Sequence, residues 1–383
     1  MNKKLAITLS CGLAGWMHTS SWAWDVHVSL MPKMNSILQD PSFSALDQPL
    51  NLPCPSDDEA EYAKLAQELH LNPHPRQGIK AISTSECKNG QQLTTGRQIL
   101  AQYSVDEPDF GMDQELPGDP RSFDPDGFQT YMGGTTGTTS QGFRHMYFGG
   151  WQFWHPINTF QVPFQTIGLA PFRAELMANK AKALLREGQT NPLKKAWAFR
   201  VLGWSLHYVQ DLGQPFHSTQ IPHLRMVNFG SIFHGGFSNL VKETTRTISN
   251  FHFAYEEYNL LALTNENSPY AECIQNTDQV APLASDPYRQ EALKSPLILA
   301  ERIAKSSVRL APEVGLACVH FFGEKLLEPG VDLPRNVGTP NYAEMLIRPD
   351  LVQSRAEIHT ATCKALANSA WASRALIQWV LSK

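Results

Sequence analysis

The sequence has no strong excess of charge of either sign. Its 32 lysines and arginines and 36 acidic residues give a formal net charge of −4 at pH 7. Domains that hold a nucleic acid as a stable partner are usually clearly basic. We therefore expect no stable nucleic-acid partner, although a nucleic acid could still enter a cleft as a substrate.

Long apolar runs are also scarce. A mainly apolar run covers residues 5–17. It follows two lysines and is too short to span a bilayer. Small residues then stand at the two positions that signal peptidase reads, so the sequence predicts a signal peptide over residues 1–23. Cleavage after Ala23 would make Trp24 the mature N-terminus and would deliver the protein to the periplasm or outside the cell. No later segment reaches spanning length without charges, so we expect no transmembrane helix.

Cysteine is rare, and no two cysteines form the C-x-x-C pair that is typical of thiolate zinc sites. Export would permit disulfides, and an odd number of cysteines after residue 23 leaves at least one outside any pair within the chain. We predict that Cys54 pairs with Cys87, because both flank one polar stretch. The cysteines that remain after removal of the signal peptide are Cys54, Cys87, Cys273, Cys318 and Cys363.

Strand signals are few and no internal repeat is visible, so the predicted fold class is mainly α, with several helices and long ordered loops. Residues 104–169 are rich in Gly, Pro, Asp, Thr and aromatics and are predicted to form a long loop, a kind of segment that often carries function. We predict a catalytic domain over residues 24–289 and a helical C-terminal extension, packed on it, over residues 290–383. Apolar periodicity and terminating residues predict helices over residues 59–69, 172–186, 192–212, part of 237–263, 296–327 and 353–381.

The first residues that indicate chemistry are His207 and Asp211. Their spacing of four on a predicted helix places both side chains on one face, one turn apart. An imidazole and a carboxylate in this position can hold one metal ion. Pro215 then turns the chain, and His217 follows directly after the end of the helix. The alternative is a polar pair on a helix surface with an unrelated histidine nearby.

His252 and Glu256 repeat the same spacing of an imidazole and a carboxylate. His234 is a rival for the histidine, but the residue four positions later is Ser238 rather than a carboxylate. A histidine in the core of an aromatic helix is the alternative interpretation. Two such pairs in one exported chain favour a site with several zinc ions, because zinc accepts both nitrogen and carboxylate oxygen ligands.

The mature N-terminus predicts a third element of this site. Trp24 would offer a free amine and its own carbonyl oxygen, and a metal readily displaces the proton of an α-amine whose pKa is near 8. His27 follows three residues later. The alternative is that both residues merely begin the first folded segment.

The segment His207-Tyr-Val-Gln-Asp211, followed by Gln214-Pro-Phe-His217, resembles the central motif of bacterial zinc-dependent phospholipases C and the related fungal single-strand-specific nucleases. The resemblance implies a mostly helical fold that holds three zinc ions, one of them bound by the amine and carbonyl of an N-terminal Trp. The zinc ligands that it implies are Trp24, His27, His207, Asp211, His217, His252 and Glu256.

The resemblance also implies an Asp and a His from the loop region before the central helix. Asp109 and His145 match these ligands best. Asp106 and Asp113 are rivals to Asp109, and His155 is a rival to His145. Acids that cap turns in a structural loop are the alternative.

The resemblance gives catalytic roles to two carboxylates. Asp211 would bridge two zinc ions, and Asp109 would bind zinc or orient the attacking water as general base. The implied reaction is hydrolysis of the glycerol-side phosphodiester of a phospholipid, which yields diacylglycerol and a phosphorylated headgroup. We expect a monomer whose partner is phospholipid at a membrane surface.

Phospholipid is favoured over single-stranded nucleic acid for three reasons. The second pair ends in Glu256 rather than the Asp expected in the nucleases. The sequence after Asp211 lacks the Gly-Asp-x-His-Gln-Pro form usual there. An aromatic cluster at residues 151–154, with Phe160 and Phe164, could touch lipid, although aromatics also form cores and stack on bases. The alternatives are a secreted single-strand-specific zinc nuclease and a non-catalytic, zinc-stabilised secreted binding protein.

Overall fold

The computed structural model describes residues 26–382, apart from 55–57, 74–80, 83–84, 103–104, 106, 111, 113–143, 154–159, 220, 222, 332 and 334–339. The signal peptide predicted over residues 1–23 and Trp24 lie outside the described residues. The mainly α class predicted from the sequence is confirmed. The α-helices are α1 (His27–Lys33), α2 (Asp58–Leu69), α3 (Gly96–Ala101), α6 (Ala170–Glu187), α7 (Pro192–Gly213), α8 (Pro215–Ser218), α9 (Gly236–Thr264), α10 (Ala271–Gln275), α11 (Thr277–Val280), α12 (Arg289–Ala292), α13 (Pro296–Phe322), α14 (Tyr342–Met345) and α15 (Val352–Leu381).

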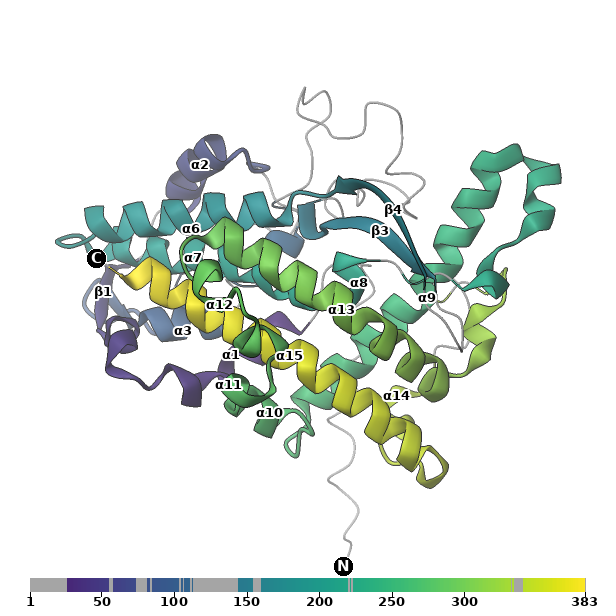
Figure 1. Ribbon diagram of the computed structural model, residues 1–383. Helices are drawn as coiled ribbons and strands as arrows, with labels where there is room; N and C mark the ends of the chain where they lie inside the picture. The colour runs from purple at the N-terminus through teal and green to yellow at the C-terminus, as the bar shows by residue number, and fades with distance from the viewer. Residues whose placement is uncertain are drawn as a thin grey trace, which may run out of the picture.

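Helix α7 packs against α6, α13 and α15 (Figure 1). It begins where the side chain of Asn191 accepts hydrogen bonds from the backbone amides of Leu193 and Lys194, with Pro192 in the first turn. Every residue from Ala196 to Gly213 is buried. A helix covered on all sides belongs to the core, so polar residues on it must find partners inside the protein.

The long C-terminal helices α13 and α15 lie against α7 and share its hydrophobic core (Figure 1). The hydroxyl of Ser307 on α13 donates to the carbonyl oxygen of Leu212, at 2.7 Å. On α15, the Ser369 hydroxyl donates to the carbonyl of Gln210, at 3.4 Å. These helices therefore cover the end of α7 that carries the predicted metal ligands, and the boundary after residue 289 stays a prediction.

Two antiparallel two-stranded sheets complete the described fold, β1 (Leu50–Pro53) with β2 (Gln91–Thr94), and the hairpin of β3 (Phe148–Phe153) with β4 (Phe160–Ile167). The β3–β4 hairpin lies within the long loop predicted over residues 104–169. Its glycines and aromatics hid the strand signal, and the register shifts between Phe148 and Gly150. The remaining 3₁₀ turns are η1 (Asn35–Leu38), η2 (Pro41–Asp47), η3 (Glu107–Phe110), η4 (Leu224–Met226), η5 (Phe229–His234), η6 (Pro282–Ser285), η7 (Glu324–Leu327) and η8 (Pro349–Leu351).

The disulfide joins Cys273 on α10 to Cys363 on α15, with their Cα atoms 5.7 Å apart. The predicted pairing of Cys54 with Cys87 is wrong. Pairing of β1 with β2 does bring these two segments together, but the Cys87 sulfur contacts the backbone carbonyl of Cys54 instead, at 3.8 Å. Both remain free thiols, as does the buried Cys318.

Among the helices of the described residues, none combines the length and the apolar character needed to cross a membrane.

Candidate metal centre

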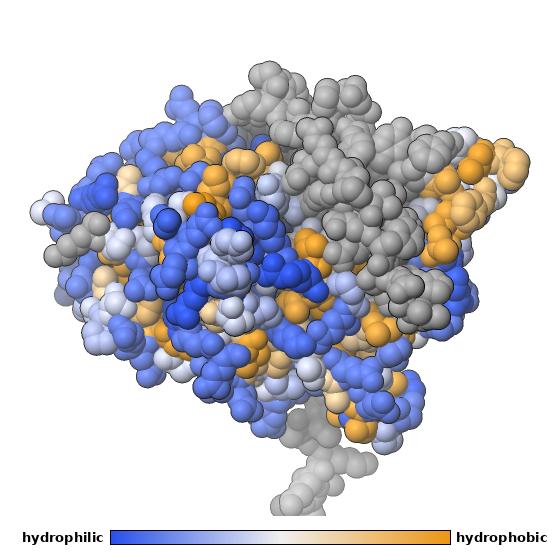
Figure 2. All heavy atoms as spheres, viewed as in Figure 1, coloured by the Kyte–Doolittle hydropathy of each residue, from blue (hydrophilic) through white to orange (hydrophobic). Residues whose placement is uncertain are grey.

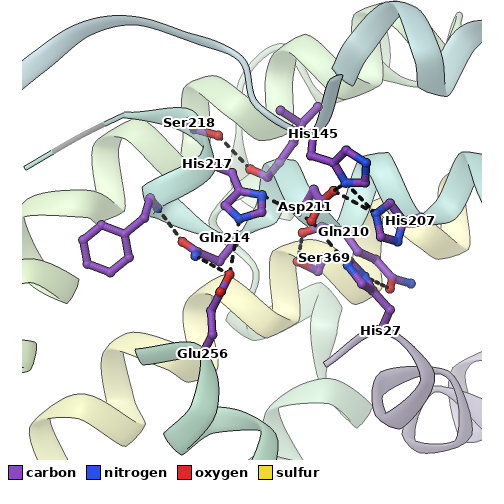
Figure 3. A network of polar contacts seen from close by, with 12 residues as sticks. His27, His145, His207, Gln210, Asp211, Gln214, His217, Ser218, Glu256 and Ser369 are labelled. Carbon is purple, nitrogen blue, oxygen red and sulfur yellow. Dashed lines mark hydrogen bonds and ion pairs between the residues drawn. The ribbon is translucent and has the colours of Figure 1, made fainter. Parts of the chain in front are cut away.

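The carboxylate of Asp211 lies at the middle of a ring of imidazoles inside the protein (Figure 3). Its Oδ1 is 3.3 Å from Nε2 of His27 and 3.2 Å from Nδ1 of His217. Its Oδ2 is 2.8 Å from Nδ1 of His145 and 3.1 Å from Nε2 of His207. All five side chains are fully buried. Residues from four separate segments thus meet at one carboxylate.

A second group forms where α8 faces α9. Nε2 of His217 lies 3.3 Å from Oε1 of Glu256 and 3.1 Å from Nε2 of His252. His252 and Glu256, one turn apart on α9, are themselves 3.0 Å apart. The predicted spacing of four therefore does bring both side chains to one place.

The donor sets fit metal ions. In the first group, His27, His207 and Asp211 each offer a ligand atom, and these atoms lie within 4.8 Å of one another. The second group, His217, His252 and Glu256, meets the same condition. Ligand atoms on a tetrahedral zinc, about 2.0–2.1 Å from the metal, are about 3.3 Å apart. The nitrogen–oxygen distances of 3.1–3.3 Å in these groups are close to that separation.

Two of the histidines are oriented through their other ring nitrogen. Nδ1 of His207 lies 2.7 Å from the carbonyl oxygen of Val105, and Nδ1 of His27 lies 2.9 Å from Oε1 of Gln210. Since both partners accept hydrogen bonds, each Nδ1 carries the proton and each Nε2 keeps its lone pair on the side of Asp211. Such outer contacts set the tautomer and direction of metal-binding histidines.

The electrostatics of the first group favour an ionised Asp211 beside a neutral His207. Burial opposes ionisation of Asp211, but the imidazoles of His207, His217 and His145 outweigh it and hold the pKa of this carboxyl well below its usual value. Burial, with His27 adding to it, lowers the pKa of His207 to about 3. A carboxylate and an unprotonated imidazole are the forms that bind metal.

In the second group, burial would raise the pKa of Glu256, but His252 and His217 lower it to about 2. Burial would lower the pKa of His217, but Asp211 and Glu256 raise it to about 9. The metal-free protein therefore holds a proton between the two carboxylates. A metal ion must displace that proton, so its binding releases protons into solution.

Gln214 is a residue of the site that sequence reasoning missed. Its Nε2 donates to Oε1 of Glu256, at 3.0 Å, and its Oε1 accepts from the backbone amide of Phe216 at the start of α8. The side chain thus fixes the carboxylate while it caps the short helix that carries His217. The sequence does indicate this residue, because Gln214 is part of the motif Gln214-Pro-Phe-His217.

A buried ion pair supports the loop beside the first group. Glu107 in η3 accepts two hydrogen bonds from Arg200 and one, at 2.7 Å, from Nε1 of Trp204. The guanidinium carbon of Arg200 also lies 4.6 Å from the ring centroid of Trp197. The pair fastens η3 to α7 directly after Val105, whose carbonyl orients His207. No sequence signal links residues so far apart in the chain.

His145 reaches the site from the segment before β3. That segment is held by two contacts: the amide of Tyr147 donates to the carbonyl of His217, at 3.0 Å, and Ala170 donates to that of Met146, at 3.4 Å. Gly168, at φ +110, allows the close approach, because a Cβ there would lie 1.9 Å from the Met146 oxygen.

Most of the other predicted ligands have side chains outside the described residues. The backbone of Asp109 lies in η3, but its side chain is outside the described residues, as are Asp106, Asp113, His155 and Trp24. The strands carry Trp151, Phe160 and Phe164, whose side chains are likewise not described, and residue 154 is outside altogether. His234 is exposed at the end of η5 and belongs to neither metal group.

No family model matches the chain, and comparisons with curated proteins and with solved structures gave no significant match either. The geometry of the site therefore carries the functional argument.

Proposed function

We propose that this protein is an exported zinc phosphodiesterase of the phospholipase C type, with the multi-helix fold of that family. The observation that supports this most is the position of Asp211, whose two oxygens face imidazoles of both metal groups. Two metal ions held close together suit phosphodiester chemistry, because they can act on the attacking and the leaving oxygen at once. A structural zinc site, by contrast, is usually a closed site that often contains Cys.

Zinc is the proposed metal because the ligands are imidazoles and carboxylates without thiolates. When bound, zinc would supply Lewis acidity toward the phosphodiester and would lower the pKa of water. One ion is assigned to the first group, extended by His145, and another ion is assigned to the second group. A third is assigned by the family resemblance alone, which implies that Trp24 would supply its amine and carbonyl.

The protein side chains have separate roles in this proposal. Asp211 stays ionised and holds charge at the centre of the site, while His207 stays neutral. Asp109 follows Glu107 in η3, which the Arg200 ion pair fixes to α7. From there Asp109 would bind metal or take the proton of the attacking water, which makes it the proposed general base.

Phospholipid is the proposed substrate. Glu256, rather than Asp, completes the second group, as the resemblance implies for the phospholipases. Cleavage on the glycerol side would give diacylglycerol and a phosphorylated headgroup. The predicted signal peptide places this reaction in the periplasm or outside the cell.

The decisive experiment uses the mature chain that begins at Trp24. Its zinc content is measured by plasma mass spectrometry, and phosphatidylcholine and single-stranded DNA are assayed side by side. We expect three zinc ions per chain, release of diacylglycerol and phosphocholine, loss of activity with 1,10-phenanthroline and recovery with zinc. Cleavage of DNA with intact lipid would move the protein to the nucleases. If the protein binds zinc stably but cleaves neither lipid nor DNA, it is a zinc-stabilised binding protein rather than an enzyme.

A second preparation tests the N-terminal ligand. One alanine added before Trp24 moves the α-amine away from the site but keeps every side chain. We expect this chain to bind less zinc than the chain that begins at Trp24. Equal zinc content in the two preparations would remove Trp24 from the ligand set.

A further inference from the structure

A short segment between α8 and α9 exposes several large apolar side chains. The exposed fractions are 88% for Phe233, 62% for Phe229, 55% for Leu224 and 40% for Ile232. We call these four side chains the apolar tip. In Figure 1 this part of the chain projects at the upper right, where α9 begins, and Figure 2 shows hydrophobic residues gathered there. Exposed apolar groups of this size usually mark an interaction site.

The tip belongs to an ordered turn. The amide and the hydroxyl of Ser231 both donate to the carbonyl of Asn228, at 2.9 and 2.7 Å. Asn239, on the first turn of α9, donates to the carbonyl of Ser231, at 3.3 Å. Gly236 adopts φ +71 at the reversal between η5 and α9, a conformation that glycine adopts without strain. Local hydrogen bonds thus hold the turn in place while the apolar side chains remain in water.

The segment that carries the tip has little net charge, which suits the surface of a zwitterionic phospholipid bilayer. Between Asp211 and Glu243 the sequence contains no carboxylate. The nearest cation on the segment, Arg225, is tied to Glu324 by an ion pair of 2.5 Å. The four side chains of the tip are uncharged, and exposed Phe and Leu side chains of this kind insert at the boundary between headgroups and acyl chains.

The segment is connected directly to the proposed catalytic centre. The chain enters it from His217 and leaves it through α9, which carries His252 and Glu256. From Gly236 to His252 the helix rises about 24 Å, at 1.5 Å per residue. The tip is thus a part of the molecule separate from the reacting groups, held at a fixed distance from them by one helix.

We propose that the apolar tip docks the protein on a phospholipid bilayer, with Phe229 and Phe233 inserted below the headgroups. The identity of the bilayer as substrate rests on the proposed function, whereas the docking itself does not. Docking would raise the concentration of the protein at the membrane and would leave the chemistry at the metal groups unchanged.

The test compares the zinc-loaded protein with the variant Phe229→Ser/Phe233→Ser. Binding is measured by sedimentation with phosphatidylcholine vesicles, in the presence of chelator to stop hydrolysis. Activity is measured on the same vesicles and on a short-chain phosphatidylcholine below its micelle concentration. We expect the variant to bind vesicles about tenfold more weakly or worse, since each Phe loses its apolar burial. Activity on vesicles should fall in parallel, and activity on the monomeric lipid should stay within about twofold.

The matched control is Ile347→Ser, which removes an apolar side chain that is 79% exposed on a different segment, after α14. This variant should bind vesicles like the parent protein. Unchanged vesicle binding in the Phe229→Ser/Phe233→Ser variant would overturn the proposal. So would a parent protein that is dimeric by light scattering and becomes monomeric in the variant, because the tip would then bind a second copy. Vesicle binding that depends on the tip, without hydrolysis of any lipid, would refute the proposed function and keep the docking.

Discussion

His217 touches the carboxylates of both metal groups, with Nδ1 3.2 Å from Asp211 and Nε2 3.3 Å from Glu256. Only one ring nitrogen can serve the second group, and Nε2 faces it. Nδ1 then faces Asp211, on the side where a carboxylate orients the metal-binding histidine of many zinc proteins. In the proposed site Asp211 would therefore have two tasks, because it would bind metal in the first group and orient a ligand of the second.

Replacement of Asp211 should consequently disturb both groups. Asp211→Asn keeps the size of the side chain but removes the charge that the surrounding imidazoles stabilise. We expect the loss of more than one zinc ion per chain and a fall of activity of about a thousandfold or more, since metal positions and water activation fail together. Zinc content and turnover are measured on the same preparation. The control is Asp350→Asn, at an exposed ion pair with Arg348. A variant with full zinc content and full activity would refute the assigned site.

Gln214 offers a way to weaken the second group alone. Gln214→Ala removes the amide that donates to Glu256, so the carboxylate loses its orientation. Contacts of this kind are worth about 10–100-fold in metal affinity. A chelator titration should reveal one zinc ion that leaves at lower chelator concentration, whereas Gln279→Ala, at an exposed site on α11, should leave the titration unchanged. Loss of all zinc ions together would instead point to a general effect on folding.

The sequence predicted the parts of this site that depend on local geometry. Helical spacing alone places His207 beside Asp211 and His252 beside Glu256, and apolar periodicity gave the limits of α6, α7 and α15 to within a few residues. The break at Pro215 correctly put His217 at the start of the next turn. These relationships span at most one or two helical turns, so no knowledge of the tertiary fold was needed.

Contacts over long distances in the chain could not be predicted in the same way. Glu107 and Arg200 are 93 residues apart, and nothing in either segment announces the other. The disulfide between Cys273 and Cys363 closes over 90 residues, whereas proximity in sequence favoured the wrong pair, Cys54 and Cys87. The position of His145 beside Asp211 likewise depends on backbone hydrogen bonds of its segment with His217 and Ala170, which the sequence does not reveal.

The buried pair of Glu107 and Arg200 should be important for stability. Arg200→Met leaves a carboxylate uncompensated inside the protein, which costs about 3–5 kcal/mol of unfolding free energy. In the double variant Glu107→Gln/Arg200→Met no buried charge remains, so part of the loss should return. Urea unfolding of the metal-free protein measures Arg200→Met, Glu107→Gln and the double variant, with Arg348→Met at an exposed pair as the control. A double variant whose loss equals the sum of the single losses would show that the two side chains act independently.

The loop position of Val105 adds a second readout for the same variants. Since the ion pair holds η3 directly after Val105, its loss should free the carbonyl that orients His207. The zinc affinity of the folded Arg200→Met protein, measured without urea, should therefore fall as well. Unchanged zinc affinity would limit the role of the pair to folding.

The environment of His359 on α15 should make the stability of the protein depend on pH, independently of the metal groups. Its Nε2 accepts a hydrogen bond of 2.6 Å from the hydroxyl of Tyr258, and burial raises the pKa of that tyrosine so that it keeps its proton. Burial, with Arg355 adding to it, lowers the pKa of His359 to about 4, against an ordinary value of 6.5. Between pH 6.5 and about 4 the unfolded chain therefore binds a proton here that the folded protein does not. Stability must fall as the pH is lowered through this window.

The measurement compares the unfolding free energy of the metal-free parent protein and of His359→Gln at pH 7, 5.5 and 4.5. Glutamine can still accept from Tyr258 but does not titrate, so the variant should lose less stability than the parent protein as the pH falls. Titration of the metal ligands is common to both proteins and cancels in the difference. His234→Gln, which changes an exposed histidine, should keep the slope of the parent protein. If the His359→Gln curve runs parallel to that of the parent protein over the whole window, His359 is already protonated in the folded state and the hydrogen bond from Tyr258 does not hold it neutral.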